Sequence, residues 1–529
     1  MSLVDRAVAS IRGPIAALIN RFAPEYYKQL IERRHAGVRV ESDASSDVRG
    51  FKDRSLAHML RALESVNLPV LTKMDDRHCW IVLADSGDDP TVLQALVLEL
   101  LGYGLRVSVT IEGYRARRVS GKKRLLKLLE RQPGRIHSIR AGTVWMRDRG
   151  YRQIGWHAAA RVHFYDWNET KAVYCARSDG SFPPMIDKRS QNLGIEVAEM
   201  SGSESRLDKI RFPIDVVYTW VDGNDRAWNE KRKARAREVG HKLHKAANSQ
   251  ARYFNRDELR YSLRSLYYYA PWVRNVYLVT DDQVPHWHDS DSKDLTIISH
   301  KELFPDESSL PTFNSHAIES VLHRIPGLSE HFLYMNDDVF LSSIVQPEAF
   351  FEVNGVARTF LSRAMIPLCG KEQSDVASEW GVMNANELLR EAHGVMMPYK
   401  TKHTPIALRR SLLADLELRY SERFQSLRGR PFRTSNDLAP TSSLHAGFGL
   451  AEGKVVRGTI AYRYLNLARP NLEQALNSVA HSRHSLVYCL NDTDVDDQSE
   501  IDWVEHEKLV TDFLKSMYPY QAPWEIERA

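Results

Sequence analysis

The sequence predicts an α/β protein that contains a mostly parallel sheet with helices on both of its faces. Two observations lead to this prediction. Strand-like and helical segments alternate regularly after residue 210, as they do in doubly wound sheets. The 529 residues are also too many for one ordinary hydrophobic core, so two or three domains are expected. A small, polar stretch at 200–209, "MSGSESRLDK", has the composition of a linker between them.

The first domain is expected over residues 1–205, as an accessory α/β domain. Helical periodicity is found at 1–35, 54–66 and 91–103, and strand-like runs at 79–85, 105–113, 160–167 and 171–177. The first of these helices is amphipathic, with Arg6, Arg12 and Arg21 between its apolar residues. Packing against its own domain is the favoured interpretation. Peripheral association with a membrane is the less favoured alternative.

The second domain is expected over residues 206–480, and residues 481–529 are expected to form a helical tail. The expected strands are 214–221, 275–280, 295–299 and 331–336, and the expected helices are 226–247, 257–269 and 315–325. In such sheets, ligands bind beyond the carboxyl ends of the strands. Acidic side chains follow three of the strands, at 222–225, 281–282 and 337–338. This edge of the sheet is therefore the expected site.

Composition and charge exclude several classes of protein. The net charge of +4 is small for this length, which argues against a nucleic-acid binder. The four cysteines, Cys79, Cys175, Cys369 and Cys489, lie far apart, so their spacing indicates neither a zinc site nor a disulfide framework. A reducing, cytoplasmic location fits best, with the inner face of the membrane as the alternative. No apolar run reaches transmembrane length, and the amino terminus lacks the pattern of a secretory signal.

A lysine- and arginine-rich run at 230–245 could have either of two roles. It is read first as the solvated face of a helix. The alternative is electrostatic guidance of phosphates or of an anionic polymer.

Two adjacent carboxylates in "YMNDDVF", Asp337 and Asp338, are the sharpest candidate for a metal site. Neighbouring carboxylates at the end of a buried strand repel each other unless a cation or hydrogen bonds compensate. Mg²⁺ prefers one or two carboxylates together with phosphate oxygens. An Asp pair in a turn or at a helix N-cap is the equally weighted alternative.

Four further residues could bind an anion. Arg260 and Arg264 lie four residues apart, on one face of the expected helix, where they could clamp a diphosphate. Surface ion pairs are the common alternative. Asn314 and His316 stand at a helix start, where free backbone N–H groups favour an anion and ordinary capping is the alternative.

The later part of the chain offers a histidine and a polar cluster. His403 precedes an expected helix that a proline would start, and a lone histidine is more often structural than catalytic. Arg433, Asn436 and Asp437 lie in a turn-like segment for which an ordinary loop remains open as an interpretation.

Four segments together resemble the conserved regions of the Stealth family of sugar-phosphate transferases. They are "IDVVYTWVDGND" (214–225), "DELRYSLRSLYYYAPWVRNVYLVTDDQVPHW" (257–287), "LPTFNSHAIESVLHRIPGLSEHFLYMNDDVFL" (310–341) and "FRTSNDLAPTSSLHAGFG" (432–449). The chain looks most similar to bacterial capsular or exopolysaccharide phosphotransferases. It is also similar to the animal lysosomal-enzyme N-acetylglucosamine-1-phosphotransferase. The resemblance covers 211–350 strongly and 400–450 more weakly, and it leaves the last fifty residues outside.

The resemblance implies a fold and a reaction. A Rossmann-like sheet would bind a nucleotide-diphosphate sugar, whose sugar-1-phosphate passes to a hydroxyl of a capsular or exopolysaccharide acceptor with release of a nucleoside monophosphate. Such chemistry depends on positioning and on neutralising charge on phosphate oxygens. Asp337 and Asp338 would hold Mg²⁺ or Mn²⁺ against the diphosphate.

The resemblance also implies roles for further residues. His403 would be the general base and Arg433 would stabilise phosphoryl oxygens, with Arg260, Asn436 and Asp437 next in rank. The substrate-lining turn is formed by Trp220, Val221, Asp222 and Gly223. Asp215 has two open interpretations, an active-site carboxylate or an acid satisfied by nearby N–H groups at the start of its strand.

Two other functions remain as alternatives. An ordinary metal-dependent glycosyltransferase would release a nucleoside diphosphate instead of a monophosphate. A non-catalytic glycan-binding protein would use the accessory domain and the basic run.

Overall fold

The computed structural model describes residues 38–40, 50–68, 72–73, 80–81, 89–111, 117–142, 144–146, 153–154, 159–177, 185–187, 210–240, 255–367, 377–467, 471–481, 485–491 and 503–526. The chain divides into two compact units, Met1–Leu207 and Asp208–Ala529. Residues 481–529, expected as a separate helical tail, belong to the second unit. The amphipathic helix expected at 1–35 lies outside the described residues.

The first unit is an α/β domain. Its strands are β1 (Val38–Val40), β2 (Thr72–Lys73), β3 (Trp80–Ile81), β4 (Arg106–Ile111), β5 (Arg117–Ser120), β6 (Ile136–Gly142), β7 (Val144–Met146), β8 (Gln153–Ile154), β9 (Ala160–His163), β10 (Tyr165–Asn168), β11 (Val173–Ala176) and β12 (Met185–Asp187). Its helices are α4 (Gly50–Ser65), α5 (Pro90–Gly102) and α6 (Lys122–Arg131). The main sheet has the order β2-β3-β9-β6-β4-β5.

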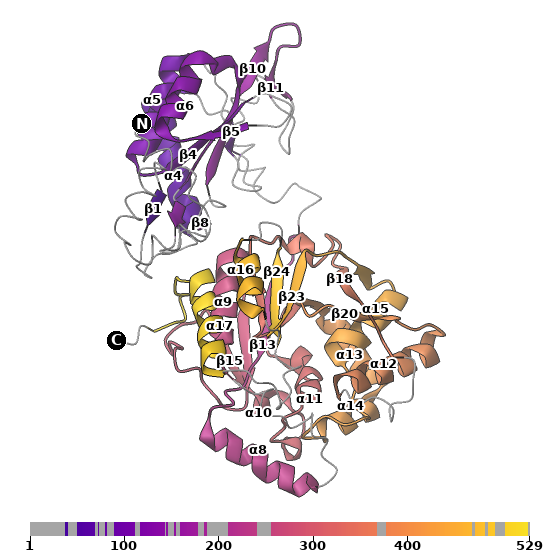
Figure 1. Cartoon of the computed structure of the whole chain (residues 1–529). Helices are drawn as coiled ribbons and strands as arrows, with labels where there is room; N and C mark the ends of the chain where they lie inside the picture. Colours follow the sequence, from indigo (N-terminus) through magenta and orange to yellow (C-terminus); the bar gives the residue numbers. More distant parts are fainter. Residues whose placement is uncertain are drawn as a thin grey trace. The chain divides into compact units, whose positions relative to one another are not determined.

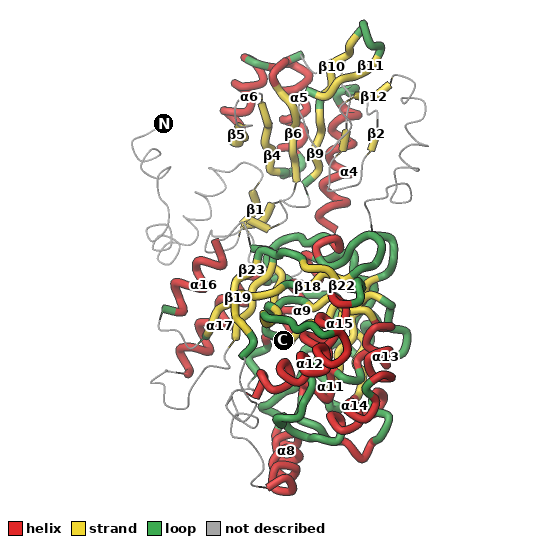
Figure 2. The backbone as a smooth tube through the Cα atoms, turned by 90° about the vertical axis from the view of Figure 1, so that its right-hand side faces the viewer, coloured by secondary structure: helices red, strands yellow, loops and turns green. Residues whose placement is uncertain are grey.

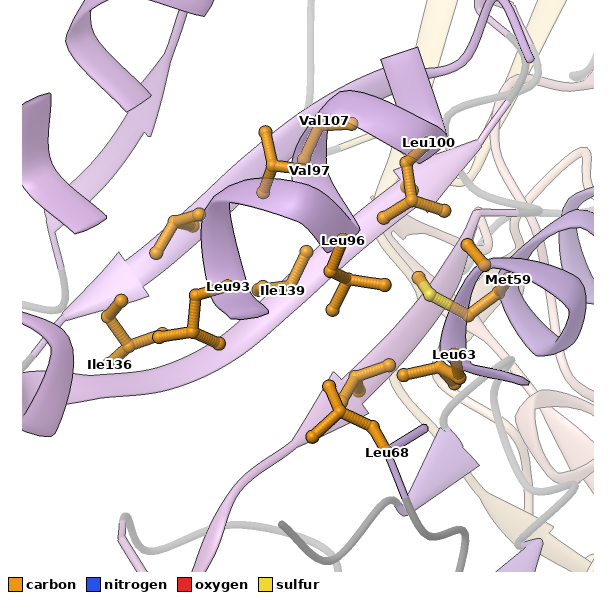
Figure 3. Packing of buried hydrophobic residues seen from close by; sticks show 14 of the residues in the cluster. Met59, Leu63, Leu68, Leu93, Leu96, Val97, Leu100, Val107, Ile136 and Ile139 are labelled. Atoms are coloured by element: carbon orange, nitrogen blue, oxygen red, sulfur yellow. The ribbon is translucent and has the colours of Figure 1, made fainter. Parts of the chain in front are cut away.

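Helix α5 illustrates how the core of the first unit forms. Asp89 caps the helix, because its side chain accepts a hydrogen bond from the backbone N–H of Thr91 at 2.8 Å, and Pro90 suits the first helical position. The buried residues Leu93, Leu96, Val97 and Leu100 follow the spacing of one helical face. They pack against β4, β6 and α4, as Figure 3 shows.

The second unit contains a central five-stranded sheet with the order β15-β14-β13-β16-β21. Its strands are β13 (Ile214–Thr219), β14 (Val276–Thr280), β15 (Thr296–Ser299), β16 (His331–Asn336) and β21 (Ile406–Arg409). The first four in sequence are parallel, and only β21 runs antiparallel to its neighbour β16. The prediction of a mostly parallel α/β sheet is confirmed.

The remaining elements of this unit surround the central sheet (Figure 1). The other strands are β17 (Val339–Leu341), β18 (Ala357–Thr359), β19 (Leu361–Met365), β20 (Tyr399–Thr401), β22 (Val455–Arg457), β23 (Tyr462–Asn466) and β24 (Val487–Asn491). The helices are α8 (Arg226–Val239), α9 (Glu258–Tyr269), α10 (His300–Leu303), α11 (Ser315–Glu319), α12 (Ala377–His393), α13 (Arg410–Arg419), α14 (Ser421–Arg428), α15 (His445–Ala451), α16 (Leu472–His481) and α17 (Trp503–Met517).

Helices cover both faces of the central sheet. On one face, alternate strand residues such as Val217 and Phe332 pack against α10, α11 and α13. On the other face, the hydroxyl of Tyr218 lies 3.0 Å from that of Ser262 in α9. Helices α12 to α15 gather on one side of the unit, whereas α16 and α17 pack together (Figure 2). Successive side chains of a strand point to opposite faces of the sheet, so Val217 and Tyr218 pack against different helices.

Strands β17 to β24 were not expected from the sequence, and two of them, β21 and β24, bear on the candidate site. Pro405 precedes β21 and not a helix, and the helix α13 begins only at Arg410. The segment expected as a helical tail supplies β24, which lies between β17 and β23. Among the described residues, no helix combines the length and apolar character that crossing a bilayer requires.

Candidate active site

The carboxyl ends of β13 and β16 form the centre of the candidate site. Thr219 and Asn336, the last residues of these strands, are direct partners in the parallel ladder. Because the strands end at the same level, Trp220 and Asp337 leave the sheet side by side. The hydroxyl groups of Thr219 and Tyr334 also lie 3.0 Å apart across the two strands. This edge is where a doubly wound sheet places its ligand site.

The antiparallel strand β21 brings His403 to the same edge. Ile406 pairs with Tyr334, so the residues before Ile406 extend past the end of β16. The Asn336 amide nitrogen Nδ2 lies 2.6 Å from His403 Nε2. The amide therefore donates to Nε2, and the neutral ring carries its proton on Nδ1. His403 Nδ1 in turn lies 3.6 Å from Asp338 Oδ2.

Cys489 completes a compact group with these two residues. Strand β24 pairs antiparallel with β17, which places Cys489 opposite Val339. The thiol Sγ lies 3.3 Å from Asp338 Oδ2 and 3.4 Å from His403 Nδ1. Cys489 is buried, whereas the side chains of Asp338 and His403 keep 21% and 31% of their surface exposed. Burial raises the pKa of the Cys489 thiol well above its ordinary value, and Asp338 adds to this increase.

Asp337 and Arg433 both act electrostatically on Tyr334. Burial raises the pKa of the Tyr334 phenol well above its ordinary value, and the charge of Asp337 raises it further. The charge of Arg433 opposes the increase. Since the Tyr334 hydroxyl lies beside Thr219, both charges are near the end of β13. An acid and a guanidinium are thus close to one edge, the combination that phosphate chemistry requires.

The loop that carries Arg433 is fastened to the start of α11. Arg433 Nη2 donates to Ser315 Oγ at 2.7 Å. Asn314 Nδ2 donates to Asp437 Oδ2 at 2.8 Å, and Asn314 Oδ1 accepts from the backbone N–H of His316 at 3.1 Å. Asn314 and Asp437 are both 0% exposed. The two side chains are thus buried and bonded to each other. Their contact with substrate stays a prediction.

The other two residues of this group differ in exposure. His316 is also buried, and its Nδ1 lies 3.5 Å from Asp437 Oδ2, so it belongs to the same internal network. Asn436 is exposed on the loop, and its contact with substrate stays a prediction.

Arg260 and Arg264 both bind the carboxylate of Glu525. Arg264 donates through Nε and Nη2 to the carboxylate of Glu525, at 2.7 and 2.6 Å. Arg260 Nε donates to the same carboxylate at 2.6 Å. The Glu525 side chain is 0% exposed. In this structure the anion that both arginines bind is the Glu525 carboxylate. Their contact with a diphosphate stays a prediction.

The turn after β13 is held by its own acids. Asp222 Oδ1 accepts from the backbone N–H of Asn224 at 3.0 Å, and Asp225 caps α8 through the N–H of Ala227 at 2.8 Å. Gln283 joins the two acids, since its Nε2 donates to the backbone oxygen of Asp222 and to Asp225 Oδ2. In the same turn, Val221 is half-buried and Gly223 is buried. Trp220 follows Thr219 at the edge where β13 and β16 end. The substrate-lining role of the turn stays a prediction.

Asp215 lies at the opposite edge of the sheet. It is four residues before Thr219, which corresponds to about 13 Å along a strand. Both of its oxygens accept hydrogen bonds from the Arg274 guanidinium, at 2.8 and 2.6 Å. The backbone N–H of Ser329 adds a bond at 2.7 Å. These bonds agree with the alternative interpretation of Asp215 as a satisfied acid at the strand start. Its catalytic role stays a prediction.

The basic run is largely neutralised within the described part of α8. Lys233 lies 3.4 Å from Glu230, and Arg235 lies 2.6 Å from Glu238. Arg232 is buried. Guidance of an anionic substrate by this helix stays a prediction, and it depends on fewer charges than the sequence suggests.

Sequence reasoning missed two residues of this region, Cys489 and Glu525. The run "LVYCLND" at 486–492 has the β-branched and aromatic content of a buried strand and ends in polar residues. That pattern could have identified β24. No local signal marks Glu525, whose partners on α9 are 261 and 265 residues away in sequence.

Comparisons with known proteins identify the family. Family models of the four Stealth protein conserved regions match residues 212–240, 252–359, 402–446 and 477–529. The exopolysaccharide phosphotransferase SCO6023 of Streptomyces coelicolor is 37% identical over 410 residues, which cover 73% of this chain and 68% of that protein. The chain belongs to the Stealth family.

The family models also correct the extent of the resemblance seen in the sequence. The segments at 257–287 and 310–341 belong to one region, conserved region 2. The fourth region is the last part of the chain, 477–529, which the sequence analysis left outside. This region of the Stealth protein contains both Cys489 and Glu525.

Other relatives match over about 60% of this chain. SCO6021 of Streptomyces coelicolor, also named an exopolysaccharide phosphotransferase, is 43% identical over 60% of this chain and 58% of its own length. The exopolysaccharide phosphotransferase CpsY of Mycobacterium leprae is 35% identical over 60% of this chain and 57% of its own length. The chain thus spans between about half and two thirds of these relatives.

Among solved structures, the galactosyltransferase LgtC in complex with donor and acceptor sugar analogues is similar at 11% identity and a TM-score of 0.30. The similarity covers 57% of this chain and 95% of that one.

Proposed function

We propose that this chain is a phosphotransferase that moves a sugar-1-phosphate from a nucleotide-diphosphate sugar to a hydroxyl of an exopolysaccharide or capsular acceptor. A nucleoside monophosphate would be released. The names of the relatives support a phosphotransferase acting in exopolysaccharide formation. The observation that carries the proposal is the 3.6 Å approach of His403 Nδ1 to Asp338 Oδ2 at the carboxyl edge of the sheet. An imidazole paired with a carboxylate there can accept the proton of an attacking hydroxyl.

His403 is arranged for proton transfer at Nε2. Asp338 faces the Nδ1–H side, which favours the tautomer whose Nε2 carries a lone pair. Asn336 occupies that lone pair with its amide N–H. An acceptor hydroxyl that displaces the amide would find Nε2 ready to take its proton, and Asp338 would then stabilise the imidazolium. This is the geometry of a base held in orientation by an acid.

Arg433 and the adjacent acids would manage the charge of the diphosphate. The Arg433 loop is fixed to α11 through Ser315, which holds the guanidinium near Tyr334 and the end of the sheet. Asp337 and Asp338 are adjacent carboxylates after β16, and carboxylate oxygens are ligands that suit Mg²⁺ or Mn²⁺. Such an ion, when bound, would neutralise charge on the diphosphate. Trp220 would provide an apolar wall for the nucleotide.

Two substitutions test these roles. Asp337→Asn and His403→Ala should each reduce turnover by at least about a hundredfold, a scale typical of lost charge stabilisation or acid–base catalysis. Asp306→Asn and His286→Ala are matched controls, because both residues are exposed and outside the site. Full activity of both site variants would refute the assigned roles.

The released nucleotide tests the reaction itself. The full chain would be incubated with a panel of nucleotide sugars, Mg²⁺ and a glycan acceptor, and the nucleotide product identified by chromatography. A nucleoside monophosphate agrees with phosphotransfer. A nucleoside diphosphate would establish the ordinary glycosyltransferase reaction instead. If no nucleotide is released but the protein binds the glycan, the non-catalytic alternative is favoured. A cytoplasmic location, at the inner face of the membrane or away from it, stays a prediction.

A further inference from the structure

The oxygen, nitrogen and sulfur atoms of Asp338, His403 and Cys489 form a nearly equilateral triangle. Its edges are 3.3 Å from Sγ to Oδ2, 3.4 Å from Sγ to Nδ1, and 3.6 Å from Nδ1 to Oδ2. A tetrahedral ion with bonds of about 2.0–2.3 Å requires ligand–ligand edges of about 3.3–3.8 Å. An ion about 2.1 Å from each atom would lie about 0.7 Å above their plane, as in a regular tetrahedron. The spacing of the three atoms therefore fits such an ion.

The donor set selects the kind of ion. A thiolate is a soft ligand that Mg²⁺ and Ca²⁺ do not use, whereas Zn²⁺ and Co²⁺ accept sulfur, imidazole nitrogen and carboxylate oxygen together. Asp338 belongs both to this group and to the carboxylate pair with Asp337, and Cys489 is the ligand that selects a softer ion here. The spacing of the cysteines could not indicate such a site, because its other two ligands come from distant parts of the chain.

The surrounding structure holds the three ligands in place. Cys489 is fixed by the pairing of β24 with β17, and the backbone N–H of Leu490 donates to the Asp338 carbonyl at 2.9 Å. His403 is held by Asn336 at its other ring nitrogen, the position where metal-binding histidines usually have an outer partner. With the ion on Nδ1, the ring proton moves to Nε2, and rotation of the Asn336 amide presents an oxygen to it. The exposed sides of Asp338 and His403 leave a route for the ion and a fourth position.

We propose that Asp338 Oδ2, His403 Nδ1 and Cys489 Sγ form a binding site for a thiophilic divalent ion of the zinc class, and that this ion inhibits the enzyme. Binding releases the thiol proton to solvent and shifts the single ring proton of His403 from Nδ1 to Nε2. His403 can then no longer accept a proton, so the ion and the base function exclude each other. The inhibition rests on the proposed function, whereas the binding does not.

Cobalt binding tests the site directly. Co²⁺ titrated into the reduced full chain should give a sulfur-to-cobalt charge-transfer band and the intense visible absorption of a four-coordinate ion. Cys489→Ser should abolish the charge-transfer band, and Cys175→Ser, at a half-buried cysteine of the first unit, should retain it. Zn²⁺ should displace the cobalt, and excess Mg²⁺ should not. A band that persists in Cys489→Ser, or no band in the unchanged chain, overturns the proposal.

A second measurement needs no variant. X-ray absorption at the zinc edge of the loaded, unchanged chain should show one sulfur among nitrogen and oxygen ligands. A shell without sulfur, or with two or more sulfurs, contradicts the assigned ligands.

Enzyme inhibition tests the consequence for catalysis. The turnover rate of each variant in the presence of Zn²⁺ is divided by the rate of the same variant in Mg²⁺ without zinc. Cys489→Ser should raise the Zn²⁺ concentration for half-inhibition by at least about tenfold, since lost metal-site groups commonly weaken binding by that much. An unchanged half-inhibition concentration contradicts the proposal. Cobalt binding without any turnover would instead refute the proposed function and leave the metal site intact.

Discussion

Replacing Glu525 by glutamine should strongly destabilise the second unit. The Glu525 side chain is 0% exposed and accepts charge-assisted hydrogen bonds from Arg264 at 2.7 and 2.6 Å and from Arg260 at 2.6 Å. Glutamine keeps the shape but not the charge, so Arg264, whose side chain is only 7% exposed, loses its counterion. Breaking a buried ion pair from one side costs about 3–5 kcal/mol. We expect the free energy of unfolding to fall by about 3 kcal/mol.

The assay is urea unfolding of the full chain, followed by tryptophan fluorescence and by hydrogen exchange in α9 and in 518–526. Hydrogen exchange separates this unit from the first, whose own transition should not change. Glu307→Gln, at an exposed glutamate, is the control and should stay within about 0.5 kcal/mol of the unchanged chain. Arg264→Met combined with Glu525→Leu removes both charges and should be less damaging than Glu525→Gln alone.

A different result would support the binding of a diphosphate by Arg260 and Arg264. If Glu525→Gln leaves stability within about 0.5 kcal/mol but raises the KM for the donor, the two arginines serve the substrate and the structural reasoning fails.

Three further outcomes are expected. Burial, with a smaller contribution from Arg409, lowers the pKa of His445 to about 3. As the pH falls below 6.5, His445 becomes protonated in the unfolded chain but stays neutral in the folded chain. The stability that the protein has above pH 6.5 is therefore lost progressively as the pH falls toward 3. About 2 kcal/mol should be lost by pH 5, and thermal unfolding of His445→Gln should show a flatter pH dependence. Asp215→Asn should lower the free energy of unfolding by about 2 kcal/mol, while the folded protein keeps its kcat. A hundredfold loss of kcat would support a catalytic role for Asp215 instead. Charge reversal of Lys233 and Arg237 on α8 should raise KM mainly at low salt, and a KM independent of salt would leave α8 as a solvated face.

Much of the central sheet could be predicted from the sequence. The strand at 331–336 was expected with the bounds that the structure gives it, because its apolar residues are followed abruptly by Asn336 and two acids. The parallel order followed from the alternation of strands and helices, and the parallel order in turn placed the candidate site at the carboxyl edge. Local sequence patterns are sufficient to predict a strand that is buried on both faces and is followed by polar residues.

The partners of individual charged residues could not be predicted in the same way. Arg260 and Arg264 have the spacing of an anion clamp, yet nothing near them in sequence shows that the anion is Glu525. Asn314 and Asp437 have the residue types of a binding site, but they are bonded to each other inside the protein. Residue type and spacing indicate what a side chain can bind, and only the fold decides which partner reaches it.

The sequence by itself determined the α/β class, the family and the position of Asp337 and Asp338 at the end of a central strand, because these depend on short-range periodicity and contiguous motifs. Only the tertiary structure decided that β21 runs antiparallel and brings His403 to Asp338, and that β24 inserts Cys489 beside both. Those contacts join segments 65 and 151 residues from Asp338, and no local rule of the chain sets the order in which distant strands pair.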